Sequence, residues 1–367
     1  MSKFSISAPS YGDGARILAP AGRIFYYDVL RALAVMAVVV LHVAALEWGT
    51  SDPSSSTWQA YNVYDSLVRW CVSVFVMLSG ALMLDPARPV SFERLLHKNV
   101  ARLALAFAVW SAVYLVWDVA CGAVEPTPKG LLHAFVTGHY HLWYLQMQVF
   151  LYLIVPLLRP VARERCLMEL MVGLAVLFCF VPNLAFMSQA VADVFSPAYD
   201  NMSTSFVCGY VGYFMLGRYL ATVEIPKRAR LALYVAALAA LAFTAAGTSW
   251  LSVDAGFGRA DLYGNLMPNT LLVSAALFVA VRYGLGDERG GRFALTLPGR
   301  VLGKFSSASF GIYLVHLLVL EGLQALGVSP DFLGAALGVP LLSLAVLLIS
   351  SVLVLLLGKA APLRRVL

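Results

Sequence analysis

The chain has 367 residues and a formal net charge of +6 at pH 7; 60% of the residues are hydrophobic and 13% are charged. Soluble globular proteins average about 45–50% apolar and about 25% charged residues, so this composition excludes a cytosolic enzyme, and it equally excludes a disordered, collagenous or disulfide-framework chain. Five cysteines form no Cys-x-x-Cys pair and lie mostly in apolar runs, which predicts neither a disulfide framework nor a metal centre.

Ten stretches of about 20 mostly apolar residues predict an all-α, polytopic membrane helix bundle. In chain order they cover residues 26–46, 66–84, 100–120, 141–158, 167–186, 204–221, 231–248, 266–283, 305–323 and 333–357. Residues 1–22 lack the features of a signal peptide and are expected to form a disordered cytoplasmic tail. One membrane domain, residues 23–358, then follows, and residues 359–367 are expected to form a second cytoplasmic tail.

The basic residues predict the orientation of this bundle. With a cytoplasmic N-terminus, the inner segments hold 22 lysines and arginines, whereas the outer segments hold two, Lys129 and Arg259. Such a split is typical of an even number of spans with both termini in the cytoplasm. The positive charge therefore reports topology and contact with membrane lipid, and no nucleic-acid partner is expected.

Ionisable residues within the first span, Asp28, Arg31 and His42, are the first candidates for a functional site. Arg31 and His42 are eleven residues apart, which puts them within about 20° on one helix face and about 16 Å apart along the axis. One polar groove can therefore pass both, with Arg31 near the cytoplasmic rim. The alternatives are a snorkelling anchor for Arg31, a packing hydrogen bond for His42, and mutual neutralisation of Asp28 and Arg31.

Basic residues also mark the second and third spans. Arg69 opens the predicted second span, and Ser79-Gly80 within it is a small-residue step that permits close helix contact. Arg94, Lys98 and Arg102 follow at i, i+4 and i+8 and predict a basic stripe. This stripe suits either anionic lipid or a phosphorylated cofactor.

Further histidines lie in later spans. His139 and His141 open the predicted fourth span, and His316 lies at or beyond the middle of the ninth. His42, His141 and His316 are therefore expected to converge at a similar depth in the outer half of the bundle. Imidazole titrates near neutral pH, so it is the usual general base for activating a hydroxyl group.

The order of these segments resembles a known membrane family. YYDVLRALAVMAVVVLHV is similar to the first-helix signature of the acyltransferase-3 family, with its Asp-x-x-Arg and Arg-x10-His pairs. RWCVSVFVMLSGALML, HLWYLQMQVFLYLIVPLLRP and FSSASFGIYLVHLLVL look most like the branch that O-acetylates cell-surface polysaccharides or their lipid-linked precursors. The resemblance runs in matching order from about Ile24 to about Leu320.

The resemblance implies ten helices in the bacterial inner membrane, an acyl-CoA donor on the cytoplasmic side and an acceptor hydroxyl on the outer side. Arg31 and His42 match the functionally essential arginine and histidine of the family, and Arg102 matches the last arginine of its cytoplasmic Arg-x-x-Arg element. Two positions depart from the pattern. Asn99 replaces the first arginine of that element, and Ser73 stands where many relatives have proline.

The leading hypothesis is an integral-membrane O-acetyltransferase that uses acetyl-CoA and no metal. Its expected catalytic residues are His42, Arg31, His316 and His141, and its expected donor-binding residues are Arg31, Arg94, Lys98, Arg102 and Arg69. The expected partners are a polysaccharide or lipid-linked glycan acceptor and other envelope-biosynthesis proteins. Direct transfer and an acyl-histidine relay both remain open. The alternatives are a transporter or flippase for a polysaccharide precursor and a non-catalytic partner of an envelope synthase.

Overall fold

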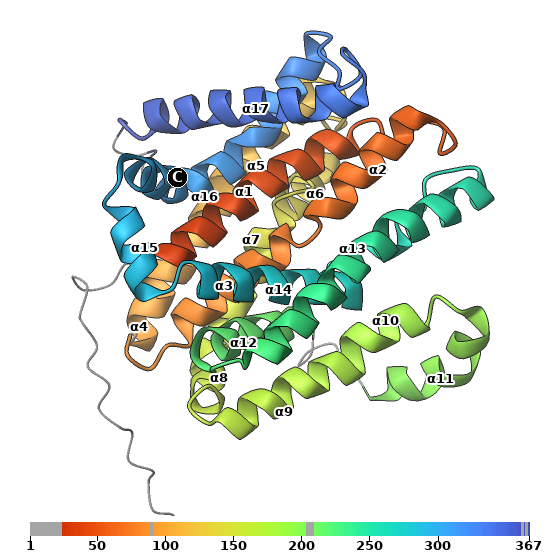
Figure 1. The fold of residues 1–367 in the computed structure, drawn as a ribbon. Coiled ribbons are helices and arrows are strands. Elements are labelled where there is room, and N and C mark those ends of the chain that lie inside the picture. Colours follow the sequence, from red (N-terminus) through yellow and green to blue (C-terminus); the bar gives the residue numbers. More distant parts are fainter. Residues whose placement is uncertain (1–23, 89–90, 203–208, 361–362, 364–365) are drawn as a thin grey trace, which may run out of the picture.

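The computed structural model describes residues 24–88, 91–202, 209–360, 363 and 366–367. All regular elements in these ranges are helices, which confirms the predicted all-α bundle (Figure 1). The expected N-terminal tail, residues 1–22, lies outside the described residues. At the other end, part of the expected tail at 359–367 contacts the bundle, because Trp110 Nε1 donates a hydrogen bond to the Val366 carbonyl, 3.2 Å away.

The first half of the chain forms α1 (Phe25–Ala45), α2 (Ser56–Val68), α3 (Cys71–Met83), α4 (Phe92–Arg94), the short π-helix η1 (Leu95–Val100), α5 (Ala101–Ala120), α6 (Pro128–Thr137), α7 (Trp143–Leu153) and α8 (Val155–Val161). The second half forms α9 (Arg165–Ala175), the short π-helix η2 (Val176–Phe180), α10 (Val181–Ala185), α11 (Gln189–Asn201), α12 (Gly209–Thr222), α13 (Lys227–Ala255), the 3-10 helix η4 (Asp261–Tyr263), α14 (Pro268–Gly284), α15 (Asp287–Ala294), α16 (Leu297–Ala325) and α17 (Ala335–Leu357).

Eight segments of the described chain are long and apolar enough to span a membrane, and the pair α7–α8, bent by 59°, makes a ninth. The sixth predicted span, 204–221, is the one left over; it corresponds to α12, which has only 14 described helical residues. Residues 203–208 at its start lie outside the described part. The polytopic helix bundle is therefore confirmed, whereas a count of ten full-length spans is not.

The predicted second span, 66–84, begins too late. The structure has one apolar segment from Ser56 to Met83, interrupted at Arg69 and Trp70, where α2 ends and α3 begins. Polar residues interrupt the apolar pattern in α2, but Asn62, Asp65 and Ser66 are buried within the bundle. Asn62, for example, donates to the Ala245 carbonyl in α13 at 2.9 Å. Polarity in this helix reflects contacts inside the bundle rather than exposure to water.

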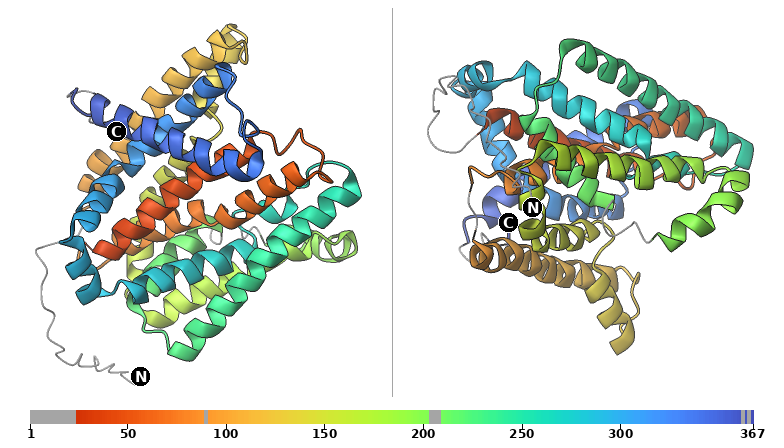
Figure 2. Two further views of the ribbon diagram at one scale, coloured as in Figure 1. Left: turned by 45° about the horizontal axis from the view of Figure 1, so that its top comes forward. Right: turned by 90° about the horizontal axis from the view of Figure 1, so that it is seen from below.

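The centre of the bundle is formed by α1, α3, α12 and α16. Figure 1 shows α17 along one side of this centre and α9 to α11 along the opposite side, and Figure 2 shows α5 and α6 at the margin. The helices α3 and α12 approach most closely through glycine. A Cβ atom on Gly80 would lie 1.8 Å from the Phe214 carbonyl oxygen, and one on Gly217 would lie 1.9 Å from that of Met77. The close contact predicted for the Ser79-Gly80 step is therefore confirmed.

The two ends of the bundle differ in chemistry. At one end, Arg159 donates to the Met83 carbonyl at 3.0 Å and Arg218 pairs with Asp85 at 3.3 Å. We call this end of the bundle the basic end. The opposite end, which we call the histidine end, contains His42, His139, His141 and His316. The elements that carry these histidines are α1, α16 and the α6–α7 loop, so the histidine end is assembled from distant parts of the sequence.

Candidate functional site

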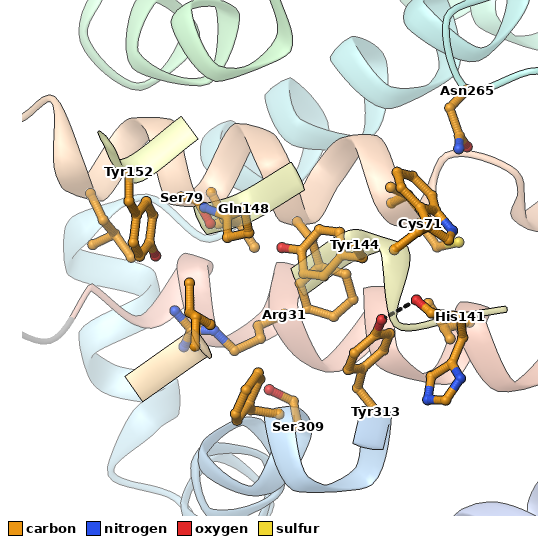
Figure 3. A pocket seen from close by; sticks show the side chains of 18 of the residues that line it. Arg31, Cys71, Ser79, His141, Tyr144, Gln148, Tyr152, Asn265, Ser309 and Tyr313 are labelled. Carbon is orange, nitrogen blue, oxygen red and sulfur yellow. Dashed lines mark hydrogen bonds between the residues drawn. The ribbon is translucent and has the colours of Figure 1, made fainter. Parts of the chain in front are cut away.

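A cavity of about 540 Å³ lies inside the bundle, which is within the usual range for ligand sites. Both Arg31 and His42 line it, as the eleven-residue spacing on α1 predicts. In Figure 3, Arg31 and Tyr152 lie toward one side of the pocket, and His141 and Asn265 lie toward the other. The cavity therefore extends from residues of the basic end to residues of the histidine end.

His42 is held by two hydrogen bonds of its Nδ1 atom. Nδ1 lies 2.8 Å from the Val38 carbonyl oxygen and 3.2 Å from His316 Nε2. A carbonyl oxygen only accepts, so Nδ1 carries the proton of the neutral ring. The lone pair of His42 is then on Nε2. Because His42 lines the cavity and its ring is oriented, it can accept a proton from a bound hydroxyl group.

His316 orients the ring of His42. It is fully buried, and its Nδ1 lies 2.6 Å from the Tyr313 carbonyl oxygen, to which it donates. Its Nε2 is therefore free to accept the proton that His42 Nδ1 offers. The expectation that His316 joins His42 is confirmed, but His316 does not line the cavity itself. Its place is that of a positioning residue.

His141 is the third histidine of the predicted group. It lines the cavity, is 3% exposed, and its ring centroid lies 5.5 Å from that of His316. Tyr313 fixes the backbone there, because its hydroxyl donates to the His141 carbonyl oxygen (Figure 3). Convergence of His42, His141 and His316 is therefore confirmed. Their surroundings also include Tyr140, whose ring lies 5.7 Å from that of His42 and which is 57% exposed.

Arg31 lies in a small polar group toward the basic end. Its Nη1 donates to Asp28 Oδ1 at 3.4 Å and to Ser306 Oγ at 3.3 Å, and Ser306 in turn donates to Asp28 at 2.9 Å. These contacts hold the guanidinium against α16 while its side chain stays 30% exposed. Arg31 is thus positioned, yet it keeps further N–H groups for an anion or a carbonyl oxygen.

The basic stripe is only partly as predicted. Lys98 and Arg102 line the cavity, together with Asn99, but Arg94 does not and is exposed. The i, i+4, i+8 spacing places residues on one face only in a regular α-helix, whereas residues Leu95–Val100 form a π-helix. Since a π-helix has more residues per turn, Arg94 is rotated away from the face that Lys98 and Arg102 share. Arg102 also donates to the Leu367 carbonyl oxygen at 3.0 Å.

Arg69 lines the cavity, but not at the basic end. It lies at the break between α2 and α3, where it forms an ion pair with buried Asp65 and covers the Tyr263 ring, 4.0 Å from its centroid. Cys71 and Asn265, which also line the cavity, lie on the same side of the pocket as His141 in Figure 3. Arg69 therefore lies at the histidine end, apart from Lys98 and Arg102, and its expected role in donor binding stays a prediction.

Sequence reasoning missed the middle of the cavity. Gln148 on α7 is 2% exposed, and within the described residues neither atom of its side-chain amide has a hydrogen-bond partner. A buried, unpaired amide is costly unless a ligand satisfies it. Gln148 lines the cavity with Tyr144, Tyr152 and Ser79 (Figure 3). A glutamine among aromatic residues gives no motif, so only its unpaired burial identifies it.

The arrangement combines three features in one cavity. Arg31, Lys98 and Arg102 lie toward one end. An oriented imidazole with a free Nε2 lies at the other end with Arg69, and an unpaired amide lies between the two ends. Such a cavity can hold an elongated anionic molecule whose reactive group reaches the imidazole.

Comparison with known proteins agrees with this chemistry. Residues 24–357, nearly the whole chain, match the sequence profile of an acyltransferase domain. Neither the search of curated proteins nor that of solved structures returned a match.

Proposed function

Because this match makes the chain a member of the acyltransferase-3 family and hence a membrane acyltransferase, we propose that it transfers an acetyl group from acetyl-CoA to a hydroxyl group of a cell-surface polysaccharide or its lipid-linked precursor. The observation that carries the proposal is the single cavity with Lys98 and Arg102 at one end and His42 at the other. The proposed setting is the bacterial inner membrane, with the basic end in the cytoplasm in accord with the positive-inside rule.

The donor enters from the basic end in this proposal. Lys98, Arg102 and Arg31 supply cationic groups for the phosphates of the donor. The pantetheine arm, which contains two amides, follows the cavity toward His42. Gln148 offers a donor and an acceptor for such an amide at the middle of this path.

The acceptor approaches from the histidine end. Tyr140, Trp143, Asn265 and Arg69 line the cavity there and combine aromatic surface with polar groups, which suits a sugar. Other envelope-biosynthesis proteins are proposed to deliver the glycan.

His42 acts as the general base in the proposed reaction. The acceptor oxygen attacks the thioester carbonyl carbon while its proton passes to His42 Nε2. The tetrahedral intermediate then collapses, the C–S bond breaks, and the proton passes from Nε2 to the thiolate to give CoA-SH. The products are an O-acetyl ester and free CoA, so the histidine is regenerated. His316 accepts a hydrogen bond from Nδ1 throughout and thereby keeps the charged ring in place.

The test is transfer of labelled acetyl groups. Membranes that contain the protein and its native envelope glycans are supplied with radiolabelled acetyl-CoA, and the glycans are extracted and counted. We expect alkali-labile label in the glycan fraction of wild-type membranes and of a His133→Ala variant, which alters an exposed histidine on α6. Absence of label in wild-type membranes would contradict the proposal. So would membranes with the His42→Ala variant that give as much label as the wild type.

A further inference from the structure

A second cluster of polar side chains lies beside the histidine pair, on the far side of His141. Asp118 in the last turn of α5, His139 in the α6–α7 loop and Glu321 on α16 bring their ligand atoms within 4.8 Å of one another. His139 Nε2 lies 3.2 Å from Glu321 Oε1 and 3.8 Å from Asp118 Oδ1. Three segments far apart in the sequence therefore meet at one imidazole nitrogen.

The distances match those between ligands of one metal ion. Zinc binds imidazole nitrogen and carboxylate oxygen at about 2.0–2.2 Å, which separates two tetrahedral ligands by about 3.4 Å. The two separations from His139 Nε2 lie on either side of this value. The side chains of His139, Asp118 and Glu321 are 8%, 20% and 21% exposed, so an ion can enter and water can complete its coordination.

The charges also favour a cation. Two carboxylates lie near one another with a single imidazole between them, and among the described residues no arginine or lysine forms an ion pair with Asp118 or Glu321. Like charges at this separation repel, and a divalent ion would balance both.

The imidazole is held in place before any ion binds. The ring of His139 stacks on that of Tyr114, with centroids 4.4 Å apart and planes 17° apart. Tyr114 is itself fixed, because its hydroxyl donates to the Leu314 carbonyl and accepts from the Leu318 N–H. On its other side, His139 Nδ1 lies 3.1 Å from His141 Nδ1. If His139 donates this bond, its Nε2 lone pair points to the carboxylates, which is the usual arrangement of a metal-bound histidine.

The backbone turn before His139 suits this placement. Gly138 ends α6 with a φ of +72°, a conformation that glycine adopts without strain. A Cβ there would lie 2.8 Å from the Phe107 ring and 3.1 Å from Ser111 Oγ, so the loop passes directly over α5. This close approach is what brings His139 to Asp118.

We propose that Asp118, His139 and Glu321 form a binding site for one divalent transition-metal ion such as Zn²⁺. The ion links α5 and α16 to the loop that carries Tyr140 and His141, and so holds the wall of the cavity next to His42. One nitrogen and two oxygen ligands favour this class of ion over Mg²⁺, which prefers an all-oxygen shell. The site departs from the expectation of no metal, and it does not rest on the proposed acetyl transfer.

The first experiment is metal binding to the purified full-length chain in detergent, after removal of bound metal with EDTA. Calorimetric titration with Zn²⁺ is expected to give about one site per chain. We expect Asp118→Asn and Glu321→Gln each to weaken binding at least about tenfold, because each removes one charged ligand while keeping the shape. Asp254→Asn, which alters an exposed carboxylate of α13, serves as the matched control and should bind like the wild type. Mg²⁺ should not compete.

The second experiment needs no variant and covers the case in which a substitution impairs folding. X-ray absorption at the zinc edge of the wild-type protein should give nitrogen and oxygen neighbours with outer-shell scattering from one imidazole. No saturable Zn²⁺ binding, binding unaffected by both substitutions, or a spectrum without imidazole would overturn the proposal. Since no acyl donor is present, these outcomes are independent of acetyl transfer.

Discussion

At the scale of single residues, the orientation of His42 matters more than its presence. An isolated histidine on α1 could carry its proton on either nitrogen, but the Val38 carbonyl and His316 Nε2 both require a donor at Nδ1. The lone pair is thereby directed to one position. This is what distinguishes His42 from His133, which is exposed on α6.

Replacement of His42 by alanine is expected to lower the rate of acetyl transfer about 10²–10⁴-fold, the usual loss for a positioned general base. Acetyl-CoA binding should change little, because the cationic residues and Gln148 remain. Radiolabel transfer gives the rate, and calorimetry with acetyl-CoA gives the binding. Equal loss of binding and transfer would instead indicate that His42 has a structural role.

Gln148 offers a separate test of the donor path. Gln148→Leu keeps the volume of the side chain and removes its amide, so the KM for acetyl-CoA should rise roughly fivefold to tenfold, as for one lost hydrogen bond. The thermal unfolding temperature should stay equal or increase, since the unpaired amide stabilises nothing in the free protein. Steady-state kinetics with purified protein measures the KM, and a melting curve measures the unfolding temperature. An unchanged KM would exclude Gln148 from the donor site.

Side-chain directions can be predicted from the sequence where the helices are regular. The prediction that Arg31 and His42 share one face is confirmed, because α1 is unbroken from Phe25 to Ala45. The prediction that Arg94 shares a face with Lys98 and Arg102 is wrong, because the π-helix after Arg94 cannot be recognised in the hydrophobic pattern. The meeting of Asp118, His139 and Glu321 could not be predicted either, because their distance in space depends on how three distant segments pack.

At the scale of helices, the contact between α3 and α12 sets the shape of the centre. The backbones of these helices approach so closely at Gly80 and Gly217 that no side chain fits between them. The sequence indicated such a contact through the Ser79-Gly80 step but could not identify its partner. The predicted second span begins too late, because the buried polar side chains of α2 interrupt the apolar pattern.

Gly80→Ala is expected to lower the unfolding temperature by several degrees, because its methyl group would meet the Phe214 carbonyl and force the helices apart. Gly173→Ala is the matched control: it lies in α9 with open space around it, so the substitution should be neutral or slightly stabilising. Melting curves of both variants in the same detergent test this. A similar melting temperature for both would mean that the close contact does not contribute to stability.

At the scale of the whole molecule, the uneven distribution of charge predicts the direction of insertion. Reporter domains fused after Gly49, between α1 and α2, and after Arg292, in α15, should report the outside and the cytoplasm respectively. These positions lie at opposite ends of the bundle, so the two signals must differ. Both reporters on one side would contradict the structure, and a full reversal would contradict the positive-inside assignment.

The cavity that joins the two ends has an electrical consequence for the proposed reaction. The proton moves from an acceptor hydroxyl near the outer side to the thiol of CoA, and an acetyl group moves the opposite way, so a neutral alcohol and a neutral thioester give a neutral ester and a neutral thiol. No net charge therefore crosses the membrane field in a turnover, although a full crossing of one charge would be worth about 2.3 kcal/mol per 100 mV. In sealed vesicles, collapsing the membrane potential with an ionophore should leave the rate of transfer unchanged, and a rate that falls would mean that a charged group crosses the field.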